Sequence, residues 1–201
     1  MMAAIEAANI PYGGTVVIQG LGLLGLYGAA IAKAKGAGFV IGIESLESRR
    51  ESGVQFGVDL TLSPESWSTS ELASLAKAAA PPRGVDSVIE VCGSAVAVES
   101  GVQMLRAGGT LVIAGLVSPQ AKFSVDGNLL LRQMLSLRGV HNYHPRHLVE
   151  ARDFVIQNKH RFPFHQLVDG RYPLADVGRA IHDSVNRTVL RAAVVPSMEP
   201  M

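Results

Sequence analysis

Short apolar runs alternate along this chain with amphipathic stretches, and glycine, proline and small polar residues separate the two kinds of segment. The runs have the length and β-branched content of strands, and they predict strands over residues 15–19, 39–44, 60–62, 85–91, 110–114 and 135–140. The amphipathic stretches predict helices over residues 1–8, 23–35, 47–56, 67–80, 95–106 and 128–134. Strands that alternate with helices in this way pair in parallel, because each crossover helix returns the chain to the same end of the sheet.

The alternation predicts an α/β fold over residues 1–143, with a doubly wound six-stranded parallel sheet (Rossmann architecture) covered by helices on both faces. From His141 onward histidine, arginine and proline cluster, and residues 144–201 are expected to form a C-terminal α+β segment. We expect no further strand–helix–strand repeat in this tail, whose last strand would extend the sheet or complete a second domain. Its predicted elements are helices over residues 148–157 and 177–184 and a strand over residues 190–195.

A glycine-rich turn follows the first predicted strand and opens the helix after it, with the sequence Gly20-Leu21-Gly22-Leu23-Leu24-Gly25. The next predicted strand ends on Glu44, nineteen residues after the last glycine of the turn. A GxGxxG sequence alone is weak evidence, but strand, glycine turn, helix, strand and acid in this order form the dinucleotide-binding fingerprint. The alternative is that the glycines only shape a tight turn and that Glu44 is a solvated strand end.

Each part of the fingerprint has a physical task. Gly20 permits the sharp turn, Gly22 lets the backbone approach a pyrophosphate, and Gly25 lets the helix pack closely on the strand. The phosphates then lie on the N–H groups at the helix N-terminus. Glu44 is placed to accept hydrogen bonds from an adenosine ribose, whereas a 2′-phosphate about 4 Å from it would cost on the order of 4 kcal/mol. The pattern therefore predicts NAD rather than NADP as the cofactor.

Composition narrows the class of protein. The 201 residues are 48% hydrophobic, which suffices for a full core, and 18 Lys and Arg balance 17 Asp and Glu. This balance favours neither nucleic acid nor a membrane surface as partner. Lys33 and Lys35 interrupt the longest apolar stretch well short of a membrane span, and the first residues given lack the charged region and cleavage site that a signal peptide would show. We expect a soluble, cytoplasmic protein.

Cys92 is the single cysteine, which excludes an internal disulfide and a cysteine-based zinc cage within this chain. It follows an apolar strand, so we expect a buried small side chain rather than a reactive thiol. Asp86 and Glu90 alternate onto one face of that strand. At strand ends they are expected to meet solvent or a helix end rather than to form an acid–base pair.

Three histidines in this tail could be interpreted as metal ligands: His141, His144 and His147. Pro145 is expected to interrupt any helix that could align them, and no acid lies among them, whereas a closed zinc site needs four ligands. A polar loop beside the cofactor is therefore the favoured interpretation of these histidines.

Several motifs together resemble one family, the medium-chain dehydrogenases, and within it the zinc-type alcohol, polyol and threonine dehydrogenases. The resemblance covers nearly the whole chain, and residues 138–145 also resemble a subgroup linked with phosphonate catabolism. The motifs lie at residues 15–25, 44–49, 56–59, 90–93, 105–110 and 172–176.

The family order is a catalytic domain, then a coenzyme domain, then a return segment. The resemblance implies that residues 1–143 are the NAD-binding domain, that residues 144–201 are the return segment, and that the catalytic domain is missing. Zinc ligands and the proton relay of relatives come chiefly from that domain, so no catalytic or metal residue carries over, and zinc is expected only in a full-length context. The implied function is an oxidoreductase that moves a hydride between an alcohol and NAD, with a small alcohol or aldehyde as substrate.

What the resemblance carries over is cofactor binding. It implies contacts with the pyrophosphate for Gly20, Gly22, Leu23, Leu24 and Gly25, and with the adenosine for Glu44 and Arg49, although Arg49 has a solvated alternative. Arg191 is implied near the phosphates, with Arg187 as its competitor. The residues implied along the cofactor toward the nicotinamide are Cys92, Gly93, Ala114, Gly115, Leu116, Val140, His141 and Asn142.

Two rival functions remain. The first is a catalytically silent or truncated module that binds NAD without turnover. The second is a methyltransferase, which is disfavoured because Gln19, rather than an acid, precedes the first glycine, and because methyltransferases lack such a closing segment. The apolar strand over residues 135–140 would be an exposed sheet edge, which predicts a homo-oligomer paired through it.

Overall fold

The computed structural model describes residues 1–80 and 83–196. The chain forms two compact units, Met1–Gln157 and Asn158–Met201. The predicted boundary after residue 143 refers to the domain plan of a longer enzyme and stays a prediction. Residues 197–201 of the predicted return segment lie outside the described residues.

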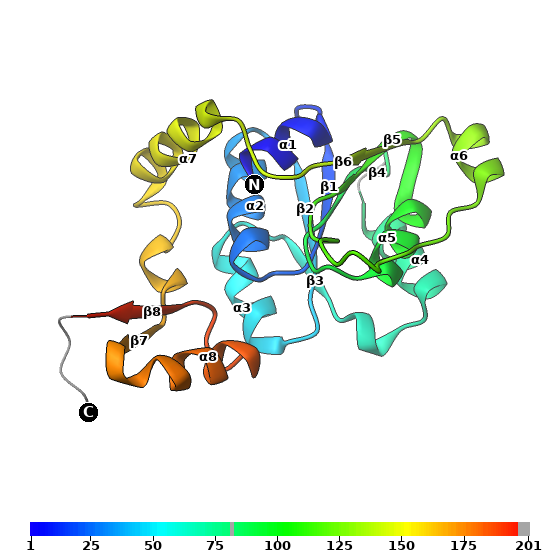
Figure 1. Ribbon diagram of the computed structural model, residues 1–201. Coiled ribbons are helices and arrows are strands. Elements are labelled where there is room, and N and C mark those ends of the chain that lie inside the picture. The colour runs from blue at the N-terminus through cyan, green and yellow to red at the C-terminus, as the bar shows by residue number, and fades with distance from the viewer. Residues whose placement is uncertain (81–82, 197–201) are drawn as a thin grey trace. The chain divides into compact units, whose positions relative to one another are not determined.

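The first unit is built on a six-stranded sheet with strand order β3-β2-β1-β4-β5-β6, in which every pair is parallel (Figure 1). This confirms the predicted doubly wound α/β fold. Four strands lie close to their predicted bounds, whereas β5 begins earlier than predicted and β6 is shorter. The strands are β1 (Thr15–Gln19), β2 (Phe39–Ile43), β3 (Leu60–Leu62), β4 (Val85–Glu90), β5 (Leu105–Ile113) and β6 (Ser136–Gly139).

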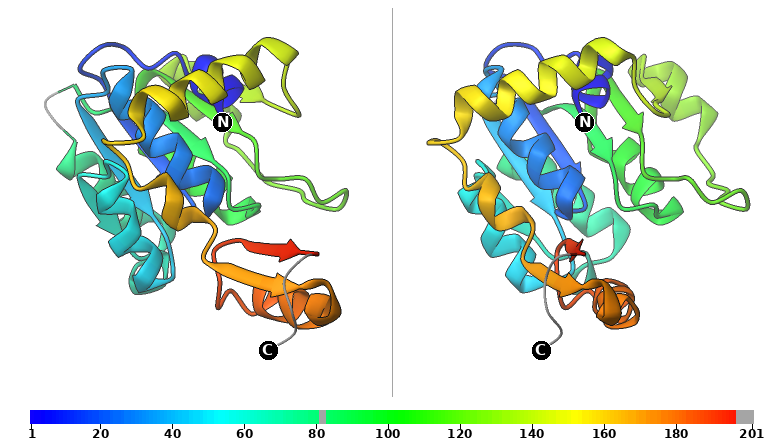
Figure 2. Two further views of the ribbon diagram at one scale, coloured as in Figure 1. Left: turned by 90° about the vertical axis from the view of Figure 1, so that its left-hand side faces the viewer. Right: turned by 60° about the vertical axis from the view of Figure 1, so that its left-hand side comes forward.

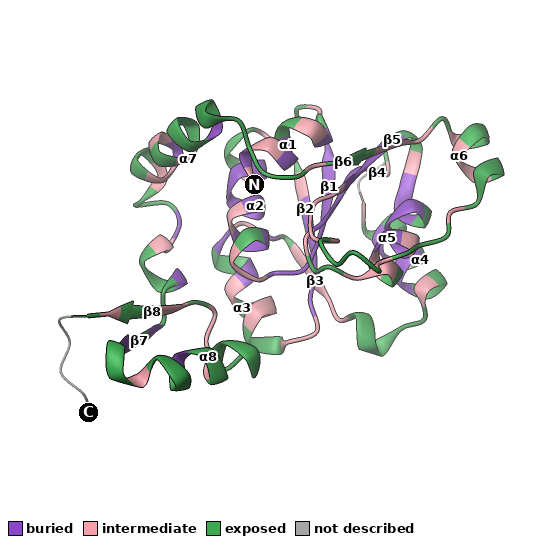
Figure 3. Cartoon of the chain, in the orientation of Figure 1, coloured by how far each residue is buried: buried purple, intermediate pink, exposed green. Residues whose placement is uncertain are grey.

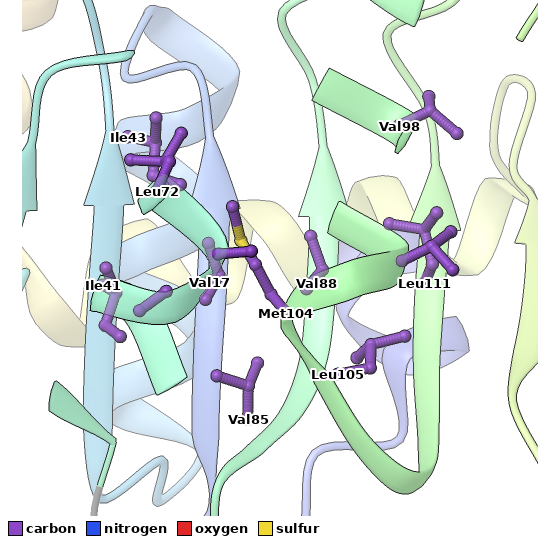
Figure 4. Close-up of a cluster of buried hydrophobic side chains, with 13 residues drawn as sticks. Val17, Ile41, Ile43, Leu72, Val85, Val88, Val98, Met104, Leu105 and Leu111 are labelled. Carbon is purple, nitrogen blue, oxygen red and sulfur yellow. The ribbon is translucent and has the colours of Figure 1, made fainter. Parts of the chain in front are cut away.

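Helices cover both faces of this sheet (Figure 1). In the 13-residue cluster drawn in Figure 4, apolar side chains of α4 and α5 pack on one face, against Val17, Ile41, Val88 and Leu111 among others. Figure 2 shows α7 running beside α1 and α2. The helices of this unit are α1 (Met2–Ala8), α2 (Leu23–Ala34), α3 (Glu47–Gln55), α4 (Thr69–Ala79), α5 (Ala95–Met104), α6 (Gly127–Gln133) and α7 (Pro145–Asn158), with a 3-10 turn η1 (Pro64–Ser66).

Local capping decides where several of these helices begin. The Ser68 side chain and Glu71 form a capping box, so α4 begins at Thr69 rather than at Trp67 as predicted. Pro145 is the first residue of α7 and does not interrupt it, which corrects the expectation from the sequence. Proline is well suited to this position, because the N–H that it lacks would have no partner within the helix.

The second unit contains η2 (Phe164–Leu167), β7 (Gly170–Pro173), η3 (Leu174–Asp176), α8 (Val177–Val185) and β8 (Ala192–Val195). β7 and β8 pair in parallel as a separate two-stranded sheet. Two parallel strands joined through a helix are a βαβ unit, so the expectation that the tail holds no such repeat was wrong. The Asp169 carboxylate fixes the return, because it accepts hydrogen bonds from the backbone N–H groups of Leu190 and Arg191.

Burial differs between the two units (Figure 3). All five residues of β1 and all six of β4 are buried. In contrast, an exposed apolar row follows α8, formed by Leu174, Val177, Ile181 and Val185. None of the described helices is long and apolar enough to cross a membrane.

Candidate functional site

The carboxyl ends of the parallel strands lie at one edge of the main sheet. From β1 the chain continues to β2 on one side, whereas β4 lies on the other side of β1. In doubly wound sheets this topological switch point is where ligands bind. The loops that meet there follow β1, β2, β4, β5 and β6. They contain the predicted cofactor residues of the first unit, except for Leu23, Leu24 and Gly25 at the start of α2 and Arg49 in α3.

Backbone geometry explains the three glycines of the turn. Gly20 has φ +97°, and a Cβ there would lie 2.9 Å from the Cβ of Cys92. A Cβ on Gly25 would lie 1.8 Å from the carbonyl oxygen of Gly20, so only glycine lets α2 pack this closely on the turn. Gly22 differs, because its Cβ would meet only Arg49 Nη1, at 3.7 Å. The middle glycine therefore borders open space.

Gly22 is also the N-cap of α2, and no side chain there accepts a hydrogen bond. The first N–H groups of a helix have no partner within it, and together with the helix dipole they attract anions. Leu23 and Leu24 begin this helix, and Leu24 is exposed. The turn thus offers uncapped N–H groups at a place where no side chain blocks approach.

Glu44 immediately follows β2 and is buried, with 7% of its surface exposed. Its Oε2 accepts the backbone N–H of Leu21 at 2.9 Å, which ties the end of β2 to the glycine turn. Its Oε1 accepts the Leu46 N–H and the Ser45 hydroxyl, each at 3.1 Å. Since a carboxylate has about four acceptor positions, one remains on Oε2, and rotation of the Ser45 hydroxyl would open another on Oε1.

Two arginines in α3 flank this acid. Arg50 Nη1 donates to the carbonyl oxygens of Glu44 and Ser45, at 2.8 and 2.6 Å, and so holds the chain after β2. The sequence does not reveal this role, because both acceptors are backbone atoms. Arg49 is half-buried beside Gly22 and forms no ion pair with any residue in the ranges 1–80 and 83–196. The cation beside the turn is therefore available to an anionic ligand.

On the other side of the switch point, Glu90 ends β4 and is fully buried. Its carboxylate accepts the backbone N–H groups of Gly93, through Oε1, and Gly115, through Oε2 at 3.2 Å. Asp86, at the start of the same strand, is also buried, pairs with Arg106 at 2.6 Å and accepts the Thr15 N–H. The expectation that both acids meet solvent or a helix end was wrong: each is an internal hydrogen-bond acceptor.

Cys92 lies between the glycine turn and Glu90. Its residue surface is exposed, which corrects the expectation that it is buried. Even so, partial burial of the thiol and then the nearby Glu90 carboxylate raise its pKa to about 11. The thiol is therefore protonated at neutral pH, and the prediction that it is not a reactive nucleophile agrees with this value.

The loops after β5 and β6 complete the set of loops at this edge of the sheet. Ala114, Gly115 and Leu116 follow β5, and a Cβ on Gly115 would lie 2.6 Å from the carbonyl carbon of Val91. After β6, the Val140 N–H donates to the carbonyl oxygen of Ile113 at 2.9 Å.

His141 and Asn142 follow β6 and are exposed, and Asn142 has φ +60°. The first unit thus brings its predicted residues to one sheet edge. Arg187 and Arg191 belong to the second unit, so their assignment to the phosphates stays a prediction.

The histidines after β6 do not gather around one point. His147 is buried in α7, and its Nε2 lies 2.8 Å from Glu6 Oε2 in α1. Within residues 1–80 and 83–196, no group of three His, Cys, Asp or Glu side chains could hold a metal ion. A zinc site therefore does not fit the described part of this chain.

Comparisons with known proteins agree with this arrangement. A family model described as zinc-binding dehydrogenase matches residues 24–157. D-xylulose reductase of Saccharomyces cerevisiae is 26% identical over 175 residues, which cover 83% of this chain and 49% of that protein. L-threonine 3-dehydrogenase of Pyrococcus abyssi is 34% identical over 134 residues, which cover 66% of this chain and 37% of that protein. The chain thus spans half or less of the length of these relatives.

Solved structures give the same picture. An alcohol dehydrogenase from Thermotoga maritima superposes with a TM-score of 0.88 and 29% identity over 98% of this chain and 55% of that one. A Sinorhizobium meliloti protein described as a zinc-binding dehydrogenase, solved with NADP bound, has a TM-score of 0.84 and 25% identity over 96% of this chain and 55% of that one. Because the family model spans α2 to α7 of the first unit, this chain belongs to the zinc-binding dehydrogenase family, as its resemblance to the zinc-type medium-chain alcohol dehydrogenases implied.

Proposed function

We propose that this chain is the NAD-binding half of an oxidoreductase of the zinc-type alcohol dehydrogenase class, which transfers a hydride between a small alcohol or aldehyde and NAD. The observation that carries the proposal is the open approach at Gly22, at the uncapped N-terminus of α2 and beside the fixed carboxylate of Glu44. A dinucleotide uses both features, the first for its pyrophosphate and the second for a ribose.

The choice of NAD over NADP rests on Glu44. Its carboxylate accepts hydrogen bonds from Leu21 in the glycine turn and from Leu46 at the start of α3, so it cannot turn away from a ligand without breaking them. A 2′-phosphate beside it would meet a fixed negative charge, at a cost of about 4 kcal/mol for a separation of about 4 Å. The NADP bound to the Sinorhizobium protein is a property of that protein. Arg49 would then lie beside the adenosine, near Gly22.

The task of this chain is to bind and orient. The glycine turn would fix the pyrophosphate, and the glycine loops after β4 and β5 would border the other half of the cofactor. When bound, NAD supplies the hydride acceptor, and orientation of the reacting groups is worth several kcal/mol of the barrier. No described residue fits a zinc site, so the Lewis acid and the proton relay would come from a part of the enzyme other than residues 1–80 and 83–196.

The alternative is a silent module that binds NAD and performs no hydride transfer. The exposed apolar row of α8 favours the first proposal, because apolar surface of this kind commonly marks a contact with another domain or chain.

A second part of the proposal is a homo-oligomer paired through β6, which lies at an edge of the six-stranded sheet. The identity of the alcohol, the phosphonate-linked subgroup and the placement in the cytoplasm remain predictions.

The deciding experiment is calorimetric titration of the purified chain with NAD and NADP, with S-adenosylmethionine as a control ligand. We expect saturable NAD binding that weakens in the Glu44→Ala variant, and little binding of NADP. Binding of S-adenosylmethionine alone would favour a methyltransferase. Binding of no nucleotide by a chain that circular dichroism shows to be folded would overturn the proposal.

A further inference from the structure

Glu90 is an unusual residue in this fold, because it is a carboxylate with no exposed surface and no cationic partner among residues 1–80 and 83–196. Its backbone partners are the N–H groups of Gly93 and Gly115, and the Cys92 thiol is a further neighbour of the carboxylate. Removal of a charge from water is costly unless hydrogen bonds replace the solvent. The two N–H groups therefore replace the solvent that this carboxylate has lost.

The two glycines belong to different loops. Gly93 follows β4, has φ +78° and lies two residues before the first residue of α5, whereas Gly115 follows β5. The two oxygens of Glu90 therefore join loops that are separated by more than twenty residues of chain. The Glu90 carbonyl oxygen adds a second tie, because it accepts the N–H groups of Ala114 and Gly115, each at 3.0 Å.

The loops approach so closely that no side chain would fit between them. A Cβ on Gly115 would lie 2.8 Å from Glu90 Oε1 and 2.8 Å from the Gly93 nitrogen. A Cβ on Gly93 would lie 3.0 Å from the Gly115 carbonyl oxygen. The Gly93 N–H has the Glu90 carboxylate as its acceptor, whereas the Gly115 N–H is shared between that carboxylate, at 3.2 Å, and the Glu90 carbonyl oxygen, at 3.0 Å. The side chain is therefore the group that joins both loops.

The position of this clamp matches the far half of a dinucleotide. With the pyrophosphate at α2 and one ribose at the end of β2, the sheet order β2-β1-β4-β5 places the remaining half beyond β1, at the ends of β4 and β5. We propose that Glu90 is a positioning residue that holds the Gly93 and Gly115 loops in the form that receives the non-adenosine half of the cofactor. This inference rests on the proposed function.

If Glu90 has this role, its replacement should weaken the binding of NAD but not that of AMP. The Glu90→Gln variant keeps the size of the side chain, but its single carbonyl oxygen cannot accept both N–H groups as the carboxylate does. NAD spans both sides of the switch point, whereas AMP occupies the adenosine side only. We therefore expect the variant to bind NAD at least about tenfold more weakly, since hydrogen bonds to a charged group are lost, and to bind AMP within about twofold of the wild-type chain.

Asp86 provides a matched control, because it is a buried carboxylate on the same strand that holds Thr15 and Arg106 instead of the two loops. Asp86→Asn should lower the melting temperature while leaving the ratio of NAD to AMP affinity unchanged. Calorimetry with NAD and with AMP on the wild-type chain and both variants, together with thermal unfolding, separates positioning from stability.

The outcomes are distinct. A Glu90→Gln chain that binds both ligands as the wild type does would overturn the role of Glu90 and leave the proposed function intact. A folded wild-type chain that binds neither NAD nor AMP would overturn both. If Glu90→Gln does not fold, amide hydrogen exchange on the wild-type chain tests the role of Glu90 instead. Slow exchange at Gly93 and Gly115 that slows further with NAD but not with AMP would support this role. Rapid exchange at both glycines would overturn it.

Discussion

His147 and Glu6 join α7 to α1: the Nε2 atom of His147 lies 2.8 Å from Glu6 Oε2, although the two residues are 141 positions apart in the chain. Arg146 donates to both oxygens of the same carboxylate, at 2.6 and 2.7 Å. The other ring nitrogen of His147, Nδ1, accepts the backbone N–H of His144 at 3.2 Å. The Glu6 carboxylate thereby ties the start of α7 to α1, and the His147 imidazole holds the backbone at the residue before the helix.

Glu6 should make stability depend on pH. The hydrogen bonds from His147 and then Arg146 lower the pKa of this carboxyl below its ordinary value of 4.5. A lowered folded-state pKa means that the ionised carboxylate favours folding above pH 4.5, and that this contribution is lost as the pH falls through the folded-state pKa. Glu6→Gln should therefore lower the melting temperature at pH 7, and the difference from wild type should shrink below pH 4.5. A difference that is constant from pH 7 to pH 3 would contradict this.

A pair of histidines caps α7. The Nδ1 of His144 accepts the Arg146 N–H at 3.2 Å, and the Nδ1 of His147 accepts the His144 N–H. These bonds give the first backbone N–H groups of the helix an acceptor that the helix itself does not supply. We expect amide exchange of Arg146, corrected for intrinsic rates, to be faster in His144→Ala than in the wild-type chain. In His144→Asn the rate should stay close to that of the wild type, because asparagine caps helices. Equal exchange in His144→Ala and the wild type would contradict the capping role of His144.

The glycine turn separates a structural glycine from a binding one. Gly25→Ala forces a Cβ to 1.8 Å from the Gly20 carbonyl oxygen, so it should destabilise the fold by about 3 kcal/mol or prevent folding. Gly22→Ala meets nothing closer than 3.7 Å and should cost less than about 1 kcal/mol, as expected for a change at an N-cap. Its methyl group should still weaken NAD binding at least about tenfold, since charge-assisted bonds to the phosphates would be lost. Denaturant unfolding and calorimetry measure the two effects, and unchanged NAD affinity in Gly22→Ala would remove the pyrophosphate from this turn.

Glu44→Gln should shift cofactor preference. The neutral amide removes the charge that faces a 2′-phosphate, so the ratio of NADP to NAD dissociation constants should fall about tenfold or more. Glu47, an exposed acid in the first turn of α3, is a matched control whose conversion to glutamine should leave the ratio within about twofold. An equal shift in both variants would show that general charge, and not the position of Glu44, sets the preference.

Cys92 should alkylate slowly despite its exposure. Its pKa of about 11, against an ordinary 9.0, leaves little thiolate at pH 7.5. We expect its reaction with iodoacetamide to be at least about tenfold slower than that of the same cysteine in an unfolded peptide of this sequence, after allowance for the greater nucleophilicity of a high-pKa thiolate. Glu90→Gln should accelerate the reaction, because the Glu90 carboxylate is the second cause of the raised pKa. A rate equal to that of the peptide would contradict the shift.

The fold of the first unit could be predicted because its signals are local. The apolar run over residues 15–19 and the glycines after it lie within eleven residues, and the strand and the turn that they form do not depend on residues distant in the sequence. The βαβ unit of the tail was missed because its strands have only four residues each, and β7 contains glycine and proline.

Side-chain roles that depend on distant partners were harder to predict. The burial of Glu90 depends on the N–H of Gly115, which is 25 residues away, and a backbone donor leaves no mark in the sequence. The exposure of Cys92 was not predictable for a similar reason, because the sequence at the end of an apolar strand does not show in which direction the following loop turns. Pro145 was misread because proline ends a helix in the interior but begins one at the first position.

The two buried carboxylates of β4 also define how this strand can pair. Asp86 and Glu90 point to one face with Val88 between them, and each has fixed partners at its own end of the strand. A slip of two residues along β1 would keep the side-chain alternation but carry a carboxylate into the apolar centre that Val88 fills. The acids thus act as register marks, so this central strand has one alignment in which both of its charges are satisfied.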